Sequence, residues 1–289
     1  MRNGLTNAAS TPKLSSMKYR VVNTLGTGAG STILLISDKT AGGKRYALKV
    51  VRKQEPEDEI YIQQALTEFE AAKKLNHPAI AKVFDCRLKK SWFKVKGAEL
   101  LLEYVEGKTL DEIEAPELGQ LVLVFCQVAS AMTHMHRRGV FHGDLKPANI
   151  MLGKTGQVKL IDFGTAWVRG QEKNRIQGTP QFIAPEQATE KTVNEKTDIY
   201  NLGATMYRMF TGRFPQQGIL KPGDDRKLVP PLKIAPRIPG TLNELIIGSL
   251  SIDPSKRPAG MFEIRDQLNA IAKHMGLAEV DLRGADEDD

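Results

Sequence analysis

The sequence predicts an α+β protein, in which a β-rich first third precedes a mainly helical remainder. Between residues 19 and 104, short apolar and β-branched runs alternate with glycine-containing or polar turns. From residue 117 onward, longer apolar segments with helical spacing take over. The chain has 289 residues and 41% hydrophobic content, which is enough for one large domain or two lobes.

The amino-acid composition indicates which kinds of binding partner and which cellular location suit this chain. The formal net charge is +7, although the last eleven residues contain six acidic side chains and one arginine. A basic body favours nucleotide phosphates, acidic protein faces or nucleic acid. The two cysteines, Cys86 and Cys126, lack metal-binding spacing and suit a reduced, cytoplasmic location. No apolar run reaches about 18 residues, so we expect no membrane span.

The pattern also predicts the domain boundaries. Residues 1–17 are small and polar, without a signal-peptide core, and are expected to form a disordered arm. A first lobe is expected over residues 18–105 and a second over residues 106–274. Residues 275–289 are expected to form an acidic, disordered tail.

A glycine-rich segment separates the first two expected strands, residues 19–25 and 32–37. Its sequence is Gly26-Thr27-Gly28-Ala29-Gly30-Ser31. Glycines at such a turn let backbone N–H groups approach a triphosphate closely. Because a strand rather than a helix follows, the turn is not expected to bind a dinucleotide.

The third expected strand, residues 45–51, carries Lys49 at its centre. A lysine in an apolar strand needs a charged partner, which the next helix, residues 60–75, can supply through Glu68. Two more strands are expected at residues 79–85 and 98–104. The lysine-rich, aromatic segment 89–96 between them favours an exposed hairpin over a nucleic-acid contact.

Helices are expected at residues 117–138, 193–210, 242–250 and 261–274. His134, His136 and His142 are expected to be packing residues rather than metal ligands, because the first two face different sides of their helix.

Polar side chains gather around a short hairpin expected within residues 141–164. Asp144, Lys146 and Asn149 precede its first strand, and Asp162 follows its second. Asn149 and Asp162 offer hard oxygen ligands, which suit Mg²⁺ bound together with nucleotide phosphates. Asp144 is then left to receive a proton.

Taken together, these motifs resemble those of the protein kinase family, especially bacterial eukaryotic-like (Hanks-type) Ser/Thr kinases, over residues 18–274. Further matching motifs are Ala47-Leu48-Lys49, His142-Gly143-Asp144-Leu145-Lys146, Asp162-Phe163-Gly164, Ala184-Pro185-Glu186, Asp198 and Arg257. The resemblance implies a two-lobed kinase fold, with a small lobe of antiparallel sheet plus one helix and a larger helical lobe.

The resemblance also implies transfer of the γ-phosphate from ATP to a protein Ser or Thr hydroxyl, with Mg²⁺ or Mn²⁺. Lys49, held by Glu68, would bind the α- and β-phosphates. Asp144 would deprotonate the acceptor, Lys146 would neutralise the γ-phosphate, and Thr179 would line the acceptor site. Residues implied to surround the nucleotide are the glycine loop, Ile33, Ala47 and Met151 around adenine, Glu103 and Val105 through their backbones, and Leu102 behind it.

The sequence departs from the family pattern at three places, and each departure leads to an expectation about function or structure. Gly30-Ser31 displaces the third loop glycine, but the Ser31 N–H should preserve ATP binding. Gly143 replaces the arginine that pairs with a phosphorylated activation loop, and residues 165–183 contain only two hydroxyls, on Thr165 and Thr179. Activity is therefore expected without loop phosphorylation. Residues 215–239 suggest a shortened or lost helix, and Thr165 suggests a threonine acceptor.

Alternative functions stay open from sequence. His142-Gly143-Asp144-Leu145 also resembles small-molecule kinases of the aminoglycoside and choline kinase type. A pseudokinase that binds ATP as a scaffold is a second alternative, and a nucleic-acid module is a third.

Overall fold

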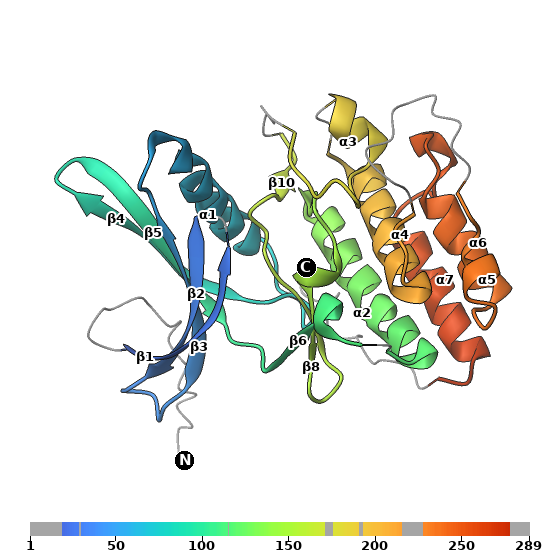
Figure 1. Ribbon diagram of the computed structural model, residues 1–289, viewed down its shortest axis with the longest axis horizontal. Coiled ribbons are helices and arrows are strands. Elements are labelled where there is room, and N and C mark those ends of the chain that lie inside the picture. Colours follow the sequence, from blue (N-terminus) through green and yellow to red (C-terminus); the bar gives the residue numbers. More distant parts are fainter. Residues whose placement is uncertain are drawn as a thin grey trace, which may run out of the picture. The chain divides into compact units, whose positions relative to one another are not determined.

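The computed structural model describes residues 19–28, 30–114, 116–170, 176–190, 193–215 and 228–277. It divides the chain into two compact units (Figure 1). The first comprises Met1–Phe69 and Lys82–Tyr104, and the second comprises Glu70–Ala81 and Val105–Asp289. Residues 70–81, predicted in the first lobe, therefore belong to the second unit. Ala71 lies in the core of that unit, and Ala81 N donates to Leu160 O at 2.9 Å.

The first unit is a five-stranded antiparallel sheet with one helix. The strand order is β1-β2-β3-β5-β4. The elements are β1 (Tyr19–Gly28), β2 (Ser31–Asp38), β3 (Arg45–Arg52), η1 (Pro56–Asp58), α1 (Glu59–Ala72, of which residues 59–69 belong to this unit), β4 (Val83–Ser91) and β5 (Lys94–Glu103). This arrangement confirms the α+β class and the position of the expected helix.

The sheet register decides which side chains share a face. Ile33 lies opposite Lys49, and Ala47 lies opposite Leu102. Directly opposed residues and residues two apart on a strand point to the same side, so these four share one face. On that face Val51 and Leu100 pack with Ile62 and Ala65 of α1, in a cluster of apolar side chains. Lys49 is thus placed beside the helix.

The prediction of a strand at residues 79–85 is wrong about where the strand begins. Ile80 instead bridges to Leu160 within the second unit, and β4 begins at Val83. The main-chain pairing partner of residues 79–81 is distant in sequence, which local patterning does not reveal. The expected exposed hairpin is present, formed by β4 and β5.

A long central helix, α2 (Leu118–Arg137), organises the second unit. Its buried side chains belong to a large core with those of α4 (Glu195–Thr211), α6 (Gly240–Ser249) and α7 (Met261–His274). α2 is long and apolar enough to cross a membrane, but 72% of its most apolar window is buried inside the structure. Packing within the unit accounts for this composition.

Short elements complete the second unit. They are β6 (Gly107–Thr109), η2 (Leu110–Glu112), β7 (Val140–Phe141), η3 (Pro147–Asn149), β8 (Ile150–Gly153), β9 (Val158–Leu160), β10 (Trp167–Val168), α3 (Pro185–Glu190), α5 (Pro231–Ile234) and η4 (Pro254–Lys256). β8 and β9 form the expected hairpin. Gln127 of α2 holds its turn, donating to Gly156 O and accepting from Val158 N.

The predicted boundary of the C-terminal tail, at residue 275, lies too early in the chain. Met275 and Leu277 pack against the core, and their N–H groups donate to Ile271 O and Ala272 O, capping α7. The expected arm, residues 1–17, and the tail beyond Leu277 lie outside the described residues. Of residues 215–239, segment 216–227 also lies outside them, and the described part holds only the short α5.

Candidate active site

Lys49 and Glu68 form the ion pair that the sequence predicts. Lys49 Nζ lies 2.7 Å from Glu68 Oε2, and Glu68 is buried. Glu70, two residues further along α1, is exposed and pairs with Lys73 on the surface. The pair satisfies a lysine that would otherwise cost desolvation energy, and it holds the ammonium at a defined point on the sheet.

The glycine loop closes between β1 and β2, where Gly28 pairs with Ser31. Gly30 adopts φ +71°, in the left-handed region that favours glycine. The ring of Tyr61 on α1 lies over it, so a Cβ at Gly30 would come within 2.1 Å of Tyr61 Cδ2. Backbone and ring together explain why glycine stands here, displaced from the position usual in the family.

The residues predicted around adenine are placed as follows. Ile33, Ala47 and Leu102 lie on the sheet face that carries Lys49. Glu103 N donates to Lys82 O at 2.8 Å, so its carbonyl is its candidate group for an adenine edge. Met151 lies on β8, and Val105 is buried. Their contacts with a nucleotide remain predictions.

Asn149 and Asp162 flank the β8–β9 hairpin. Ile161 N donates to Asn149 O at 3.0 Å, extending the ladder so that Asp162 follows directly. Asn149 Nδ2 donates to Asp144 O at 2.8 Å, which leaves its amide oxygen as the acceptor end. Asp162 has φ +64°, a conformation that aspartate tolerates better than most residues. Two hard oxygen donors at one hairpin edge fit Mg²⁺ bound with phosphates.

Asp144, Lys146 and Thr179 form a compact polar network. Lys146 Nζ donates to Asp144 Oδ2 at 2.9 Å and to Thr179 Oγ1 at 2.8 Å. Thr179 N donates to Asp144 Oδ1 at 2.7 Å. Both carboxylate oxygens of Asp144 are therefore held, and the network links the catalytic-loop residues to the segment before α3. Its members are a base, a cation and a hydroxyl at the expected acceptor position.

A glutamine absent from the sequence prediction ties the same two segments together. Gln187 Nε2 donates to Gly143 O at 2.5 Å and to Gln177 O at 2.7 Å. Gln187 is 1% exposed. Gly178, at φ +132°, leaves room for it, since a Cβ there would lie 3.0 Å from Nε2. A glutamine in a helix has no sequence signal for this role, because both its partners are distant in sequence.

Asp198 of α4, one of the matching motifs, holds the loop that contains His142 and Gly143. It is fully buried and accepts from His142 N and Gly143 N, each at 2.8 Å. His136 Nε2 lies 2.8 Å from the same carboxylate, and Nδ1 makes a longer, 3.3 Å ion-pair contact with Glu195. Burial alone lowers the pKa of His136, but the bonds to Asp198 and Glu195 outweigh it and raise the pKa to about 9. His136 is therefore a charged anchor, beyond the packing role expected from sequence. Within the described residues, no His, Cys, Asp and Glu cluster suits a metal ion.

This anchor makes stability depend on pH. The folded-state pKa of His136 lies above the ordinary value of 6.5. Protonated His136 therefore contributes fully to the free energy of unfolding below pH 6.5, and this contribution is lost as the pH rises towards 9. The contribution is on the order of 3 kcal/mol. Urea unfolding between about pH 6 and pH 9 should show the stability gap between wild type and His136→Gln shrinking with pH. A gap that is constant across this range would contradict the charged anchor.

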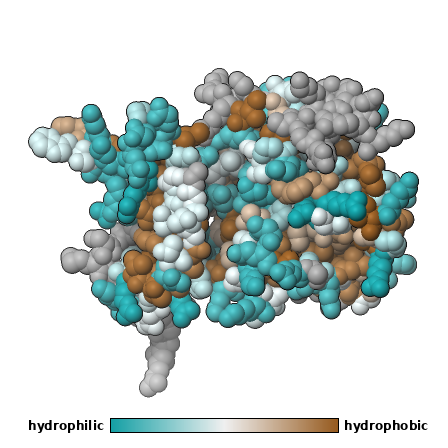
Figure 2. Space-filling model, in the orientation of Figure 1, coloured by the Kyte–Doolittle hydropathy of each residue, from teal (hydrophilic) through white to brown (hydrophobic). Residues whose placement is uncertain are grey.

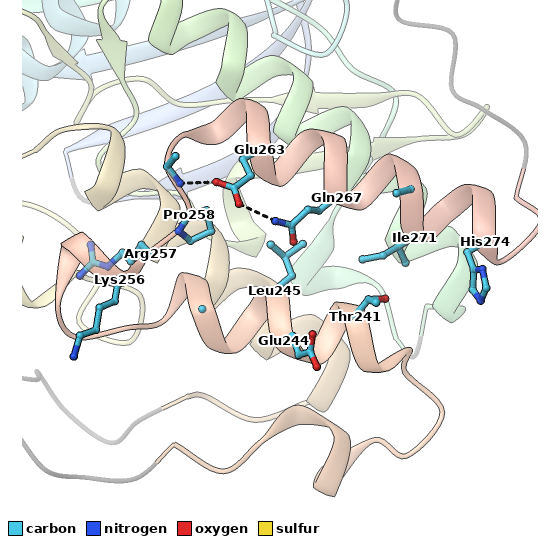
Figure 3. Close-up of a pocket in the computed structure, with 13 residues that line it drawn as sticks. Thr241, Glu244, Leu245, Lys256, Arg257, Pro258, Glu263, Gln267, Ile271 and His274 are labelled. Carbon is cyan, nitrogen blue, oxygen red and sulfur yellow. Dashed lines mark hydrogen bonds between the residues drawn. The ribbon is translucent and has the colours of Figure 1, made fainter.

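A buried ion pair fixes the end of the activation segment. Arg257 Nη1 and Nη2 lie 2.7 and 2.9 Å from the two carboxylate oxygens of Glu186, the second residue of α3. Arg257 also borders a cavity of about 600 Å³ between α6 and α7 (Figure 3). Glu263 projects there and accepts from Gln267 and Ala259 N. None of the residues predicted to handle phosphate lines this cavity.

A five-stranded sheet with a lysine–glutamate pair, and a helical unit with this network of Asp144, define the protein kinase class. A model of the protein kinase domain matches residues 19–269. The chain is 30% identical over 288 residues to serine/threonine-protein kinase PknB of Mycolicibacterium smegmatis, covering 93% of this chain and 45% of that protein. It is 32% identical over 285 residues to serine/threonine-protein kinase pkn3 of Myxococcus xanthus, covering 90% and 51%.

Serine/threonine-protein kinase PknD of Chlamydia pneumoniae is 26% identical over 296 residues, covering 89% of this chain and 31% of that protein. The chain thus spans about half the length, or less, of these curated relatives. It belongs to the protein kinase family, and these curated relatives are bacterial serine/threonine-protein kinases.

Proposed function

We propose that this chain transfers the γ-phosphate of ATP to a serine or threonine hydroxyl of a protein, without requiring phosphorylation of its activation loop. The observation that carries the proposal is the network in which Asp144 is held by Lys146 and Thr179 N. Phosphoryl transfer depends on positioning and charge stabilisation rather than on covalent chemistry by the protein. This network supplies both beside an acceptor position.

Each group has a distinct part. Asp144 would orient the acceptor hydroxyl and take its proton, while Lys146 would neutralise charge on the γ-phosphate. Lys49, positioned by Glu68, would hold the α- and β-phosphates. Asn149 and Asp162 would hold Mg²⁺, which would supply positive charge to neutralise the phosphates. Thr179 would line the acceptor site through its contact with Lys146.

Independence from loop phosphorylation is supported by two features. Both hydroxyls of residues 165–183 already make hydrogen bonds, Thr165 Oγ1 to His142 O at 3.3 Å and Thr179 Oγ1 with Lys146. The Gln187 amide links Gly143 of the catalytic loop to Gln177 of the activation segment. A neutral hydrogen-bonded tie thus links the two segments, and it needs no phosphate charge.

The test compares protein co-expressed with a phosphatase and untreated protein. Initial rates of transfer to a peptide should agree within about twofold, because the tie needs no added charge. Gln187→Glu, which keeps the shape but removes both donors, should lower kcat and raise peptide KM by about tenfold or more while leaving the ATP KM nearly unchanged. Gln120→Glu, at an exposed position, is the matched control.

Loss of transfer after phosphatase treatment, mapped to residues 165–183, would overturn the proposed independence. The same assay, run with a peptide pair that differs only in serine against threonine, tests the threonine acceptor that Thr165 suggests. A clear preference for serine would contradict it.

A further inference from the structure

The tip of the β4–β5 hairpin exposes two adjacent aromatic side chains. Ser91 pairs with Lys94, which leaves Trp92 and Phe93 as the turn. Trp92 is 93% exposed and Phe93 98% exposed, whereas the next most exposed large apolar side chain of the described residues, Val21, is 57% exposed. Two aromatic side chains of this size without burial are a cost in water unless something else covers them.

The backbone of this turn adds a second observation. Trp92 adopts φ +56°, in the left-handed region that two-residue hairpin turns usually fill with asparagine or glycine. A bulky residue in this conformation is strained. The chain therefore places an aromatic pair at a position where smaller residues would fold more easily, which indicates a role for the side chains themselves.

Positive charge surrounds the aromatic tip. From residue 87 to residue 98 the chain has five basic and no acidic side chains, namely Arg87, Lys89, Lys90, Lys94 and Lys96. Lys89 pairs with Glu99 at 2.9 Å, and the other four are exposed. The apolar end of the hairpin is thus collared by cations on both strands.

The hairpin also extends away from its sheet. β3 pairs with β5 only from Gly97 to Glu103, so the outer part of the hairpin stands as two strands alone. Figure 1 shows this extension past the other strands of the first unit, and Figure 2 shows hydrophobic and near-neutral surface at its end. The tip is convex, whereas proteins that bind single-stranded nucleic acid stack bases along a groove.

We propose that this hairpin docks on the surface of an anionic phospholipid bilayer, with Trp92 and Phe93 inserted at the interface. Aromatic side chains favour the headgroup level of membranes. Lysines beside them can extend their ammonium groups to lipid phosphates, and each cation near an anionic surface strengthens binding by about fivefold. Apolar insertion and a basic collar are the two signals that stable peripheral binding requires. Such a contact lies at the bilayer surface and is not a membrane span.

The test uses the intrinsic fluorescence of the hairpin. The chain has two tryptophans, and Trp167→Phe leaves Trp92 as the only one. Titration with vesicles of phosphatidylglycerol and phosphatidylcholine should shift the Trp92 emission to shorter wavelength. Binding should be at least about tenfold stronger than to phosphatidylcholine alone and should weaken in high salt. No shift with the anionic vesicles would overturn the proposal.

Co-sedimentation with the same vesicles separates the tip from the rest of the basic surface. The double variant Trp92→Ser/Phe93→Ser should bind at least about tenfold more weakly. Phe262→Ser, at another exposed apolar side chain, is the matched control and should bind as wild type does. Unchanged binding of the double variant would overturn the proposal. The proposal would also be overturned if Trp92 and Phe93 were needed for binding to a single-stranded oligonucleotide, or for self-association, and not for binding to vesicles.

Discussion

Replacing Asp144 with asparagine is expected to reduce phosphate transfer by about 10²- to 10⁴-fold and to leave nucleotide binding nearly unchanged. The carboxylate accepts from Lys146 on one oxygen and from Thr179 N on the other. An amide has one acceptor oxygen, so its NH₂ group must face one of these two donors. The amide also cannot take the acceptor proton, and the chemical step therefore loses its base.

Transfer of labelled phosphate to a peptide measures the first effect, and calorimetric titration with ATP-Mg²⁺ measures the second. Asp111→Asn, at an exposed position of the second unit, is the matched control for removing one carboxylate. Transfer by the Asp144 variant at the rate of wild type would contradict the assigned role. A wild-type chain that binds ATP but transfers no phosphate would instead support the pseudokinase alternative.

Replacing Arg257 with methionine is expected to destabilise the protein by about 3–5 kcal/mol. The side chain of Arg257 is 3% exposed and makes a bidentate pair with Glu186, which is 6% exposed. Its guanidinium also donates to Ser251 O and Lys196 O, at 2.8 and 2.7 Å. The variant leaves a buried carboxylate and two backbone carbonyls without these donors, and desolvated groups of this kind are costly.

Urea unfolding gives the free-energy difference. Arg265→Met is the matched control, because Arg265 pairs with the exposed Asp266 and such surface pairs contribute about 0–1 kcal/mol. The double variant Glu186→Gln/Arg257→Met should recover part of the loss, since it also removes the unpaired charge. An Arg257 variant no less stable than the Arg265 variant would rule out an energetic role for the buried pair.

Local sequence patterns were sufficient to predict the strands and the hairpin on which the candidate site residues lie. Strand alternation and glycine turns predicted the antiparallel sheet, and a lysine in an apolar strand required the partner found in Glu68. The order of Asp144, Lys146, Asn149 and Asp162 around a hairpin was equally readable, because a hairpin brings sequence neighbours to one edge.

Other features could not be predicted from local sequence. Gln187 meets Gly143 across 44 residues, and His136 meets Asp198 across 62. The late start of β4 and the packing of Met275 and Leu277 likewise depend on partners elsewhere in the chain. Periodicity reveals which side of an element is buried, but not what it will touch.

The sequence by itself determined the fold class and the protein kinase family, and it proposed residues for phosphate, Mg²⁺ and acceptor. Spacing along strands and turns encodes these properties directly. Only the tertiary structure decided that Asp144 is held on both oxygens, that Gln187 ties two loops and that His136 is charged. It also revealed a fully exposed aromatic tip. Each depends on contacts or burial set by how distant segments pack.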